Sequence, residues 1–344
     1  NPLGPLSIRW GYLGKLAPWL YQFLRACRPD AYRRGIEAMG NLMSLAGDAH
    51  LEMLEATGLK HLLRQSGVLF VYRSEASCDA SAASWQHRAR YGFDCQRLGR
   101  AGIRNMEPAL GEEAQAGYFV PSWWNYRDPK ELLIELAAHL RQCGVQFQTG
   151  NVAGFDIGTD GPIAVRFDDG ATLAFDRVVI CAGAWSGRLS AMLGEPFSIV
   201  ADRGYNTTLP SPGIEIGRTI DFAEDSFVIT PMSMGYRIGG AVELATPEAA
   251  PNYARCAALL TLAKRYLPEL NVEGGSQWMG CRPSTPDSVP VISRSAKHGN
   301  VFYCFGHGHL GLTGSMVSGR LIGHLVAGET PNIDMAPYRI DRFR

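Results

Sequence analysis

The stretch 301–316, VFYCFGHGHLGLTGSM, limits the fold of this chain more than any other, because it places Gly306, Gly308 and Gly311 between two apolar runs. The run before the glycines predicts a strand, and the run after them predicts a helix at about 312–327. A Gly-x-Gly-x-x-Gly turn between a strand and a helix is typical of dinucleotide-binding βαβ units.

The sequence after this helix does not fit a dinucleotide fingerprint. In that fingerprint a second strand follows the helix and ends, about 20 residues after the glycines, on an acid that holds a ribose. Here the helix leads into GETPNIDMAPYRIDRFR, which has no β-run, and Glu329 lies at about the right distance but in a turn. The pattern therefore argues against a nicotinamide-dependent dehydrogenase built on this motif.

The physical properties of the turn remain useful in another enzyme class. A glycine-rich turn into a helix presents free backbone N–H groups and the positive end of the helix dipole. Gly314, Gly319 and Gly323 allow another backbone or a flat ligand to approach closely. In a flavoenzyme, such a terminus would stabilise negative charge at the N1/C2=O edge of the reduced ring.

Composition describes an ordinary globular protein. The 344 residues are 46% hydrophobic and suggest two domains or one large one. The 33 basic and 33 acidic residues give no net charge, so nothing favours a nucleic-acid partner. Eight scattered cysteines show no metal-ligand spacing, and no signal peptide or membrane-spanning run is evident. We therefore expect a reducing, cytoplasmic location.

Residues 1–29 form an unusual basic and aromatic segment. Four basic residues occur before the first acid, Asp30, and Trp, Tyr, Phe and Leu side chains lie between them. Interfacial membrane helices combine these residue types. We favour a helical segment packed on its own domain, because Pro18 should interrupt the helix. Peripheral contact with the inner face of a membrane through residues 7–29 is the alternative.

Hydrophobic periodicity predicts a mixed chain of helices and strands. The segment DPKELLIELAAHLRQCG has a clear helix start, with Asp128 as N-cap and Pro129 in the first turn, and Gly144 ends it. The other expected elements are a helical region at 31–63, strands at 67–73, 145–150, 151–158, 163–170 and 171–183, an antiparallel block at 199–245 and a helix at 252–266.

Five segments, in order along the chain, resemble those of the FAD-dependent D-amino acid oxidase and glycine oxidase superfamily. The branch that they resemble most is the bacterial D-amino acid dehydrogenases. The segments are NYRDPKELLIELAAHLRQCGVQFQTGNVAGF (125–155), DRVVICAGAWSGRL (176–189), DRGYNTTL (202–209), WMGCRPSTPDSVPVIS (278–293) and VFYCFGHGHLGLTGSMVSGRLIGHLVAGE (301–329). The resemblance extends over essentially the whole chain, and five ordered segments are far more specific than any one of them alone.

The resemblance implies an α/β flavoprotein with an α+β substrate part. A discontinuous, Rossmann-like FAD-binding domain would join an antiparallel-sheet substrate domain. The expected FAD-binding segments are 128–192 and 276–330, and the substrate domain would mainly use 30–127 and 193–275. The leading nucleotide-binding βαβ unit of the family has no counterpart in this sequence, which makes a non-catalytic chain without FAD a rival interpretation.

The resemblance also assigns site residues. Arg282 would grip a substrate carboxylate through two parallel hydrogen bonds; the alternative is a structural pair with Asp287. His307 is either an acid/base catalyst or a residue that shapes the turn, and His309 is expected to shape the turn. The residues expected to contact the cofactor are Val152, Ala182, Gly183, Gly306, Gly308, Gly311, Leu312 and Thr313.

Several aromatic residues have two interpretations. Each could line the active site, but a core position is at least as well supported; these residues are Trp123, Trp124, Tyr126, Tyr205 and Tyr236. Phe227 stands where family members often carry a substrate-contacting tyrosine.

The expected reaction is FAD-dependent oxidation of a D-amino acid, or of a related secondary amine such as hydroxyproline, to the imino acid. A glycine or sarcosine oxidase-like activity is the alternative. Electrons would pass to a quinone or another carrier, or to oxygen, and the sequence does not decide between these acceptors.

Overall fold

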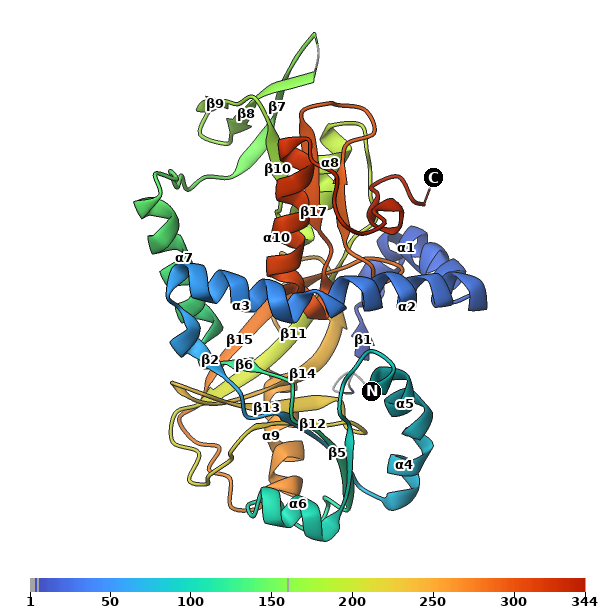
Figure 1. Cartoon of the computed structure of the whole chain (residues 1–344), viewed down its shortest axis with the longest axis vertical. Helices are drawn as coiled ribbons and strands as arrows, with labels where there is room; N and C mark the ends of the chain where they lie inside the picture. Colours follow the sequence, from blue (N-terminus) through green and yellow to red (C-terminus); the bar gives the residue numbers. More distant parts are fainter. Residues whose placement is uncertain (1–3, 5, 160, 344) are drawn as a thin grey trace.

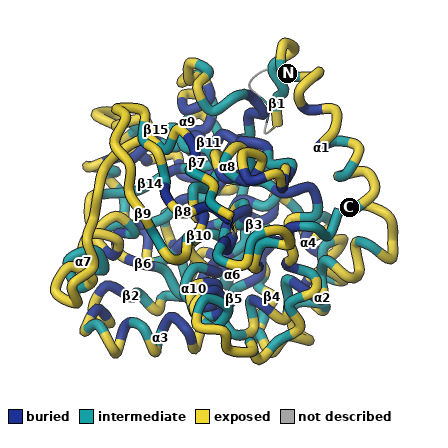
Figure 2. Tube along the Cα trace, turned by 90° about the horizontal axis from the view of Figure 1, so that it is seen from above, coloured by how far each residue is buried: buried dark blue, intermediate teal, exposed yellow. Residues whose placement is uncertain are grey.

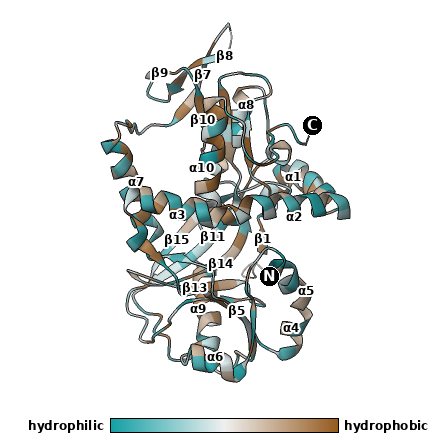
Figure 3. Ribbon diagram, in the orientation of Figure 1, coloured by the Kyte–Doolittle hydropathy of each residue, from teal (hydrophilic) through white to brown (hydrophobic). Residues whose placement is uncertain are grey.

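The computed structural model describes residue 4 and residues 6–159 and 161–343. Figure 1 shows a smaller layer around β10 and β17 above a large sheet, with helices α2 and α3 lying across the middle. Apolar and polar residues alternate along these two helices (Figure 3). Among the described residues, no helix is both long enough and apolar enough to cross a membrane.

The large sheet is mostly antiparallel. Its strands, in spatial order, are β15 (Ser276–Ser284), β11 (Val200–Leu209), β14 (Gly235–Leu244), β13 (Phe227–Met232), β12 (Thr219–Phe222), β3 (Val68–Tyr72), β5 (Ala116–Val120) and β4 (Gln96–Gly99), and β1 (Leu6–Ile8) pairs with β14. Along β13 every second residue is buried, as expected for a strand with one face on a core. Helix α9 (Ala254–Tyr266) covers that core.

The smaller sheet has the order β10 (Val178–Ile180), β17 (Val301–Phe305) and β16 (Val291–Arg294). Strands β10 and β17 are parallel, so their carboxyl ends meet at one edge. Phe302 of β17 packs with helix α10 (Gly311–Ala327) on one face, and Tyr303 packs in a separate cluster on the other. This sheet therefore brings the glycine turn beside the end of β10.

The remaining elements surround these two sheets. They are η1 (Trp10–Tyr12), α1 (Leu13–Ala26), α2 (Pro29–Ser44), α3 (Ala46–Thr57), η2 (Lys60–Leu62), β2 (Leu63–Arg64), α4 (Glu75–Ala80), α5 (Ala82–Ala89), α6 (Arg100–Met106), β6 (Asn125–Tyr126), α7 (Pro129–Gln142), β7 (Val152–Gly158), β8 (Gly161–Phe167), β9 (Thr172–Ala174), η3 (Gly183–Trp185), α8 (Ser186–Met192), η4 (Gly308–Leu310) and η5 (Ala336–Tyr338). Strands β7, β8 and β9 form their own antiparallel sheet.

Most predicted elements are confirmed. Helix α7 begins after Asp128, whose side chain accepts a hydrogen bond from the Lys130 backbone N–H, 2.8 Å away. Hairpin β13–β14 and helices α9 and α10 lie where periodicity predicts them. The domain boundaries stay a prediction.

Two local predictions are wrong. The segment 145–150 is not a strand, although its sequence alternates; its side chains are exposed, and a strand forms only by pairing with a neighbour. Pro18 does not interrupt α1, which runs through it. Pro18 is the sixth residue of α1, past the first turn, so the helix continues although proline cannot donate a backbone hydrogen bond to the preceding turn.

Candidate active site

A buried carboxylate, Asp202, joins two side chains from distant segments. Asp202 on β11 lies directly opposite Arg282 on β15, and Arg282 Nη1 is 3.0 Å from Asp202 Oδ1. The other carboxylate oxygen of Asp202 is 2.8 Å from Nε2 of His309, an exposed residue of η4. The carboxylate thus fixes Arg282 and His309 relative to each other.

The guanidinium of Arg282 lies across Gly204, two residues after Asp202 on the same face of β11. A Cβ atom at Gly204 would fall well inside van der Waals contact of this guanidinium. The glycine therefore leaves room for the guanidinium in this position. Within the described part of the chain, Nη1 is the one guanidinium nitrogen of Arg282 with a hydrogen-bond partner. The remaining N–H groups are free to bind a carboxylate.

The glycine turn lies next to Arg282. Gly306 and Gly308 have φ values of +85° and +51°, which favour glycine. Ser284, two residues after Arg282, forms a β-bridge with His307 inside the turn. The end of β15 therefore connects the proposed carboxylate-binding residue to the turn that opens α10.

His307 directs its ring toward helix α10. Its Nε2 is 2.8 Å from the Ser318 hydroxyl oxygen, and burial lowers the pKa of the ring to about 4. The imidazole is therefore neutral near pH 7, and one of its nitrogens is already engaged. These contacts favour a role in shaping the turn, and the acid/base role of His307 stays a prediction.

His50 is a positioning residue that sequence patterns missed. Its Nε2 lies 3.1 Å from the Leu312 carbonyl oxygen and 2.9 Å from that of Thr313, so Nε2 carries the proton. Its Nδ1, 2.6 Å away, then accepts a hydrogen bond from the Tyr126 hydroxyl. This pair fixes the first turn of α10. A single histidine in an amphipathic helix gave no motif to reveal it.

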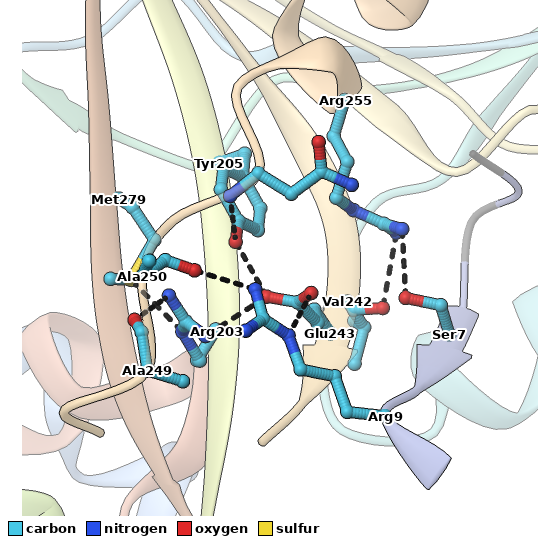
Figure 4. A network of polar contacts seen from close by, with 11 residues as sticks. Ser7, Arg9, Arg203, Tyr205, Val242, Glu243, Ala249, Ala250, Arg255 and Met279 are labelled. Atoms are coloured by element: carbon cyan, nitrogen blue, oxygen red, sulfur yellow. Dashed lines mark hydrogen bonds and ion pairs between the residues drawn. The ribbon is translucent and has the colours of Figure 1, made fainter. Parts of the chain in front are cut away.

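A buried charge network lies on the face of β11 opposite to Asp202. Its residues on β11 point to that face because alternate side chains of a strand point to opposite faces. Arg203 Nη1 is 3.1 Å from Glu243 Oε2, and the Tyr205 hydroxyl donates to the same oxygen at 2.6 Å (Figure 4). Arg9, just after β1, donates from Nε to Glu243 Oε1 at 2.9 Å. The network thereby ties the segment before α1 to the strand that carries Asp202.

Comparison with known proteins decides the family. A family model described as FAD dependent oxidoreductase (DAO) matches residues 9–325. This chain is a member of the DAO family. A D-amino-acid oxidase of Bradyrhizobium diazoefficiens is 32% identical over 348 residues, which span 100% of this chain and 82% of that protein. A D-amino acid dehydrogenase of the same organism is 30% identical over 99% of this chain and 82% of its own length.

Solved structures show the same fold. Glycine oxidase from Geobacillus kaustophilus superposes with a TM-score of 0.75 at 24% identity, over 89% of this chain and 82% of that one. L-proline dehydrogenase from P. horikoshii gives 0.73 at 20% identity, over 88% and 82%. The two-part fold of the D-amino acid oxidase type, predicted from the sequence, is confirmed, and as a DAO family member the protein is an FAD-dependent oxidoreductase.

The residues at the carboxyl ends of β10 and β17 fit the FAD of the DAO family. Gly183 has a φ of +55°, and the position of its missing Cβ meets no atom within 4 Å, so the space above it is open. Leu312 and Thr313 are exposed in the first turn of α10. The side chains of His307 and Leu310 do not cap the helices that they precede. The backbone N–H groups at these N-termini can therefore bind an anionic or electron-rich group.

The cofactor residues predicted from sequence therefore fall into two groups. Seven of them gather at the two strand ends and the glycine turn: Ala182, Gly183, Gly306, Gly308, Gly311, Leu312 and Thr313. Val152 opens β7 in a separate sheet. The role of every member of both groups stays a prediction.

The alternative prediction, that Arg282 pairs with Asp287, is wrong. Asp287 binds Arg342 instead, with its two carboxylate oxygens 2.8 and 2.9 Å from Nε and Nη2. Phe227 also lies away from Arg282: its ring stacks on Phe222 with centroids 4.3 Å apart, inside the core below α9. The hydroxyl that Phe227 lacks therefore has no bearing on this site.

The remaining aromatic candidates are mostly structural. Tyr236 donates to the Ile214 carbonyl oxygen at 3.0 Å. Trp123 packs edge-on against Phe70, with ring centroids 5.6 Å apart. Tyr205 belongs to the Glu243 network, and Tyr126 is bound to His50.

Proposed function

We propose that this chain oxidises the C–N bond of a D-amino acid, or of a related secondary amine such as hydroxyproline, to the imino acid. The observation that carries the proposal is the Arg282 guanidinium beside the glycine turn. Asp202 holds it through Nη1, and its other N–H groups have no hydrogen-bond partner within the described residues. The names of the two curated relatives, a D-amino-acid oxidase and a D-amino acid dehydrogenase, support it.

In the proposed reaction, Arg282 binds the substrate carboxylate through its free N–H groups. Asp202 restrains the guanidinium, so the substrate is held in one orientation at little further entropic cost. FAD, when bound, supplies the chemistry by accepting the α-hydrogen as hydride. Because that hydrogen leaves as hydride, no side chain has to remove it as a proton, and the chain's own contribution is positioning. Water then hydrolyses an acyclic imino acid to the oxo acid.

The helix terminus after Gly308 would contribute electrostatically. The N-termini of η4 and α10 lack side-chain caps, and backbone N–H groups at such an end favour developing negative charge. His50 keeps this turn in place through the Leu312 and Thr313 carbonyl groups.

We also propose that the electron acceptor is a quinone reached from a membrane surface that α1 contacts. Trp10, Tyr21 and Leu24 are 86%, 62% and 66% exposed, although apolar side chains of this size are usually buried. Tyr21 and Leu24 lie on α1, where Lys15 and Arg25 are also exposed, and Trp10 lies in η1, directly before α1. In Figure 2, α1 lies at the edge of the molecule and is largely exposed. Aromatic and leucine side chains beside basic ones suit an anionic lipid surface.

Anaerobic absorption spectroscopy of the FAD-loaded protein tests the reaction. The flavin bands should bleach on addition of a D-amino acid and persist with its L-enantiomer. Bleaching by glycine or sarcosine alone would instead support the alternative substrate class. A protein that takes up no FAD, or whose bands stay unchanged with every amine tried, would overturn the proposal. The rate at which a quinone analogue re-oxidises the reduced flavin under nitrogen, compared with the rate of its re-oxidation by air, identifies the electron acceptor.

A further inference from the structure

Two cysteines lie side by side at the ends of the parallel strands β10 and β17. The register pairs Val179 with Phe302 and Ile180 with Tyr303, where β10 ends. Continued by one residue, the same register places Cys181 opposite Cys304. Paired residues of neighbouring strands project to the same face and lie about 4.8 Å apart. A disulfide requires Cα atoms roughly 4.4–6.8 Å apart, and the spacing expected from continued strand pairing falls within this range.

The two thiol groups influence each other's pKa. The interaction between the two thiols lowers the pKa of Cys181 and, together with burial, raises the pKa of Cys304. Cys181 is exposed, whereas Cys304 is partly buried. The pair therefore combines an exposed thiol with a lowered pKa and a partly buried thiol on the neighbouring strand.

The two cysteines lie next to the two turns that are predicted to contact FAD. Cys181 directly precedes Ala182 and Gly183, and Cys304 is separated from Gly306 by one residue. Both turns are predicted to contact FAD. Joining the two sulfur atoms would draw the Cβ atoms to about 3.8 Å, closer than ordinary strand pairing, at the point where the two turns begin.

We propose that Cys181 and Cys304 form a reversible redox pair whose disulfide weakens binding of FAD at the adjoining turns. The oxidant is a peroxide. The Cys181 thiolate attacks one peroxide oxygen, which breaks the O–O bond and gives a sulfenic acid and water once a proton is taken up. Cys304 then attacks the sulfenic sulfur, the S–S bond forms, and the hydroxyl leaves as a second water. A dithiol reductant reverses the reaction.

Disulfide mapping tests the first half of the proposal. The full chain is treated with hydrogen peroxide, its free thiols are alkylated in denaturant, and the digest is analysed by mass spectrometry. A peptide linking Cys181 to Cys304 should appear, vanish with dithiothreitol, and be lost in Cys181→Ser and Cys304→Ser. It should persist in Cys27→Ser, which removes another exposed thiol. Cross-links scattered over other cysteines, or oxidation of Cys181 without a cross-link, would overturn the redox pair.

FAD titration of the oxidised and reduced chain tests the second half. The oxidised protein should bind FAD at least tenfold more weakly, and peroxide-treated Cys181→Ser should bind it like the reduced protein. Equal FAD affinity in the two redox states would overturn the link to the cofactor. Neither measurement involves substrate, so loss of the proposed amine oxidation would leave both readouts intact.

Discussion

Asp202 and Arg282 face each other across β11 and β15, with Nη1 of the arginine 3.0 Å from one carboxylate oxygen. The second oxygen of Asp202 binds His309, in the turn that opens α10. A single buried carboxylate thus links the large sheet to the glycine turn of the smaller one. Asp202 thereby contacts both the residue proposed to bind the substrate carboxylate and a residue of the turn predicted to bind FAD.

Replacing Arg282 should weaken substrate binding with little effect on FAD. A charge-assisted bidentate contact is worth roughly 2–5 kcal/mol, so Arg282→Ala should raise KM for a D-amino acid on the order of 10²-fold or more. Arg282→Lys should recover part of the loss, since lysine keeps the charge but lacks the planar fork. Steady-state dye reduction with matched FAD content measures both variants. An unchanged KM in Arg282→Ala would mean that the carboxylate binds elsewhere.

Gly204→Ala should disturb the same guanidinium without removing it. The new methyl group would overlap the end of the Arg282 side chain, which is flexible and can move away. We therefore expect KM to rise about tenfold while the melting temperature changes little. Gly239→Ala on β14 is the matched control, because its Cβ would meet Asn206 at an ordinary 3.4 Å. Equal KM values for the two variants would contradict the placement of Arg282 over Gly204.

Burial of His307 should make the fold sensitive to acid. Its pKa is lowered to about 4 in the folded chain, against about 6.5 for an unfolded histidine. The folded state therefore binds the proton less readily, and stability that is fully present above pH 6.5 is lost as pH falls toward 4. The loss is about 3 kcal/mol by linkage. His307→Gln keeps a hydrogen-bonding group near Ser318 but does not titrate.

Urea unfolding of the wild type and His307→Gln at pH 7 and pH 4.5 measures this effect. The wild type should lose more unfolding free energy than the variant over that interval. Parallel losses in both proteins would show that the ring is not a titrating, buried group.

The sequence predicts the parts of this structure that depend on local rules. The cap of α7 at Asp128 and the strand–turn–helix around Gly306 follow from residues that are neighbours in the chain. The pairing of Asp202 with Arg282 does not, because it depends on the register of two strands that three further strands and α9 separate in sequence. Asp287 is closer than Asp202 to Arg282 in the sequence, yet in the structure Asp287 binds Arg342.

Two other failures have the same cause. The alternating sequence of 145–150 has strand character, but no described strand lies beside it to pair with. The role of His50 depends on two carbonyl groups more than 260 residues away, which no spacing in the sequence can indicate. Long-range register and packing therefore decide what local patterns leave open.

The exposed face of α1 should bind anionic membranes. Each basic residue near an anionic surface contributes about 1 kcal/mol, and Lys15, Arg25 and Arg28 are all exposed here. The protein should therefore cosediment with vesicles containing phosphatidylglycerol but not with neutral phosphatidylcholine vesicles, and added salt should weaken binding by screening. The double variant Trp10→Ser/Leu24→Ser should bind at least tenfold more weakly.

Leu133→Ser is the matched control for this experiment, because Leu133 on α7 is also exposed and apolar but lies on a different helix. It should bind like the wild type. Equal binding to neutral and anionic vesicles, or equal loss in the control and the double variant, would show that α1 is not the contact. Dye reduction in solution should be unchanged in the double variant, because neither residue is among those proposed to bind substrate or FAD. Only electron transfer to a membrane-dissolved quinone should then fall, which separates membrane contact from catalysis.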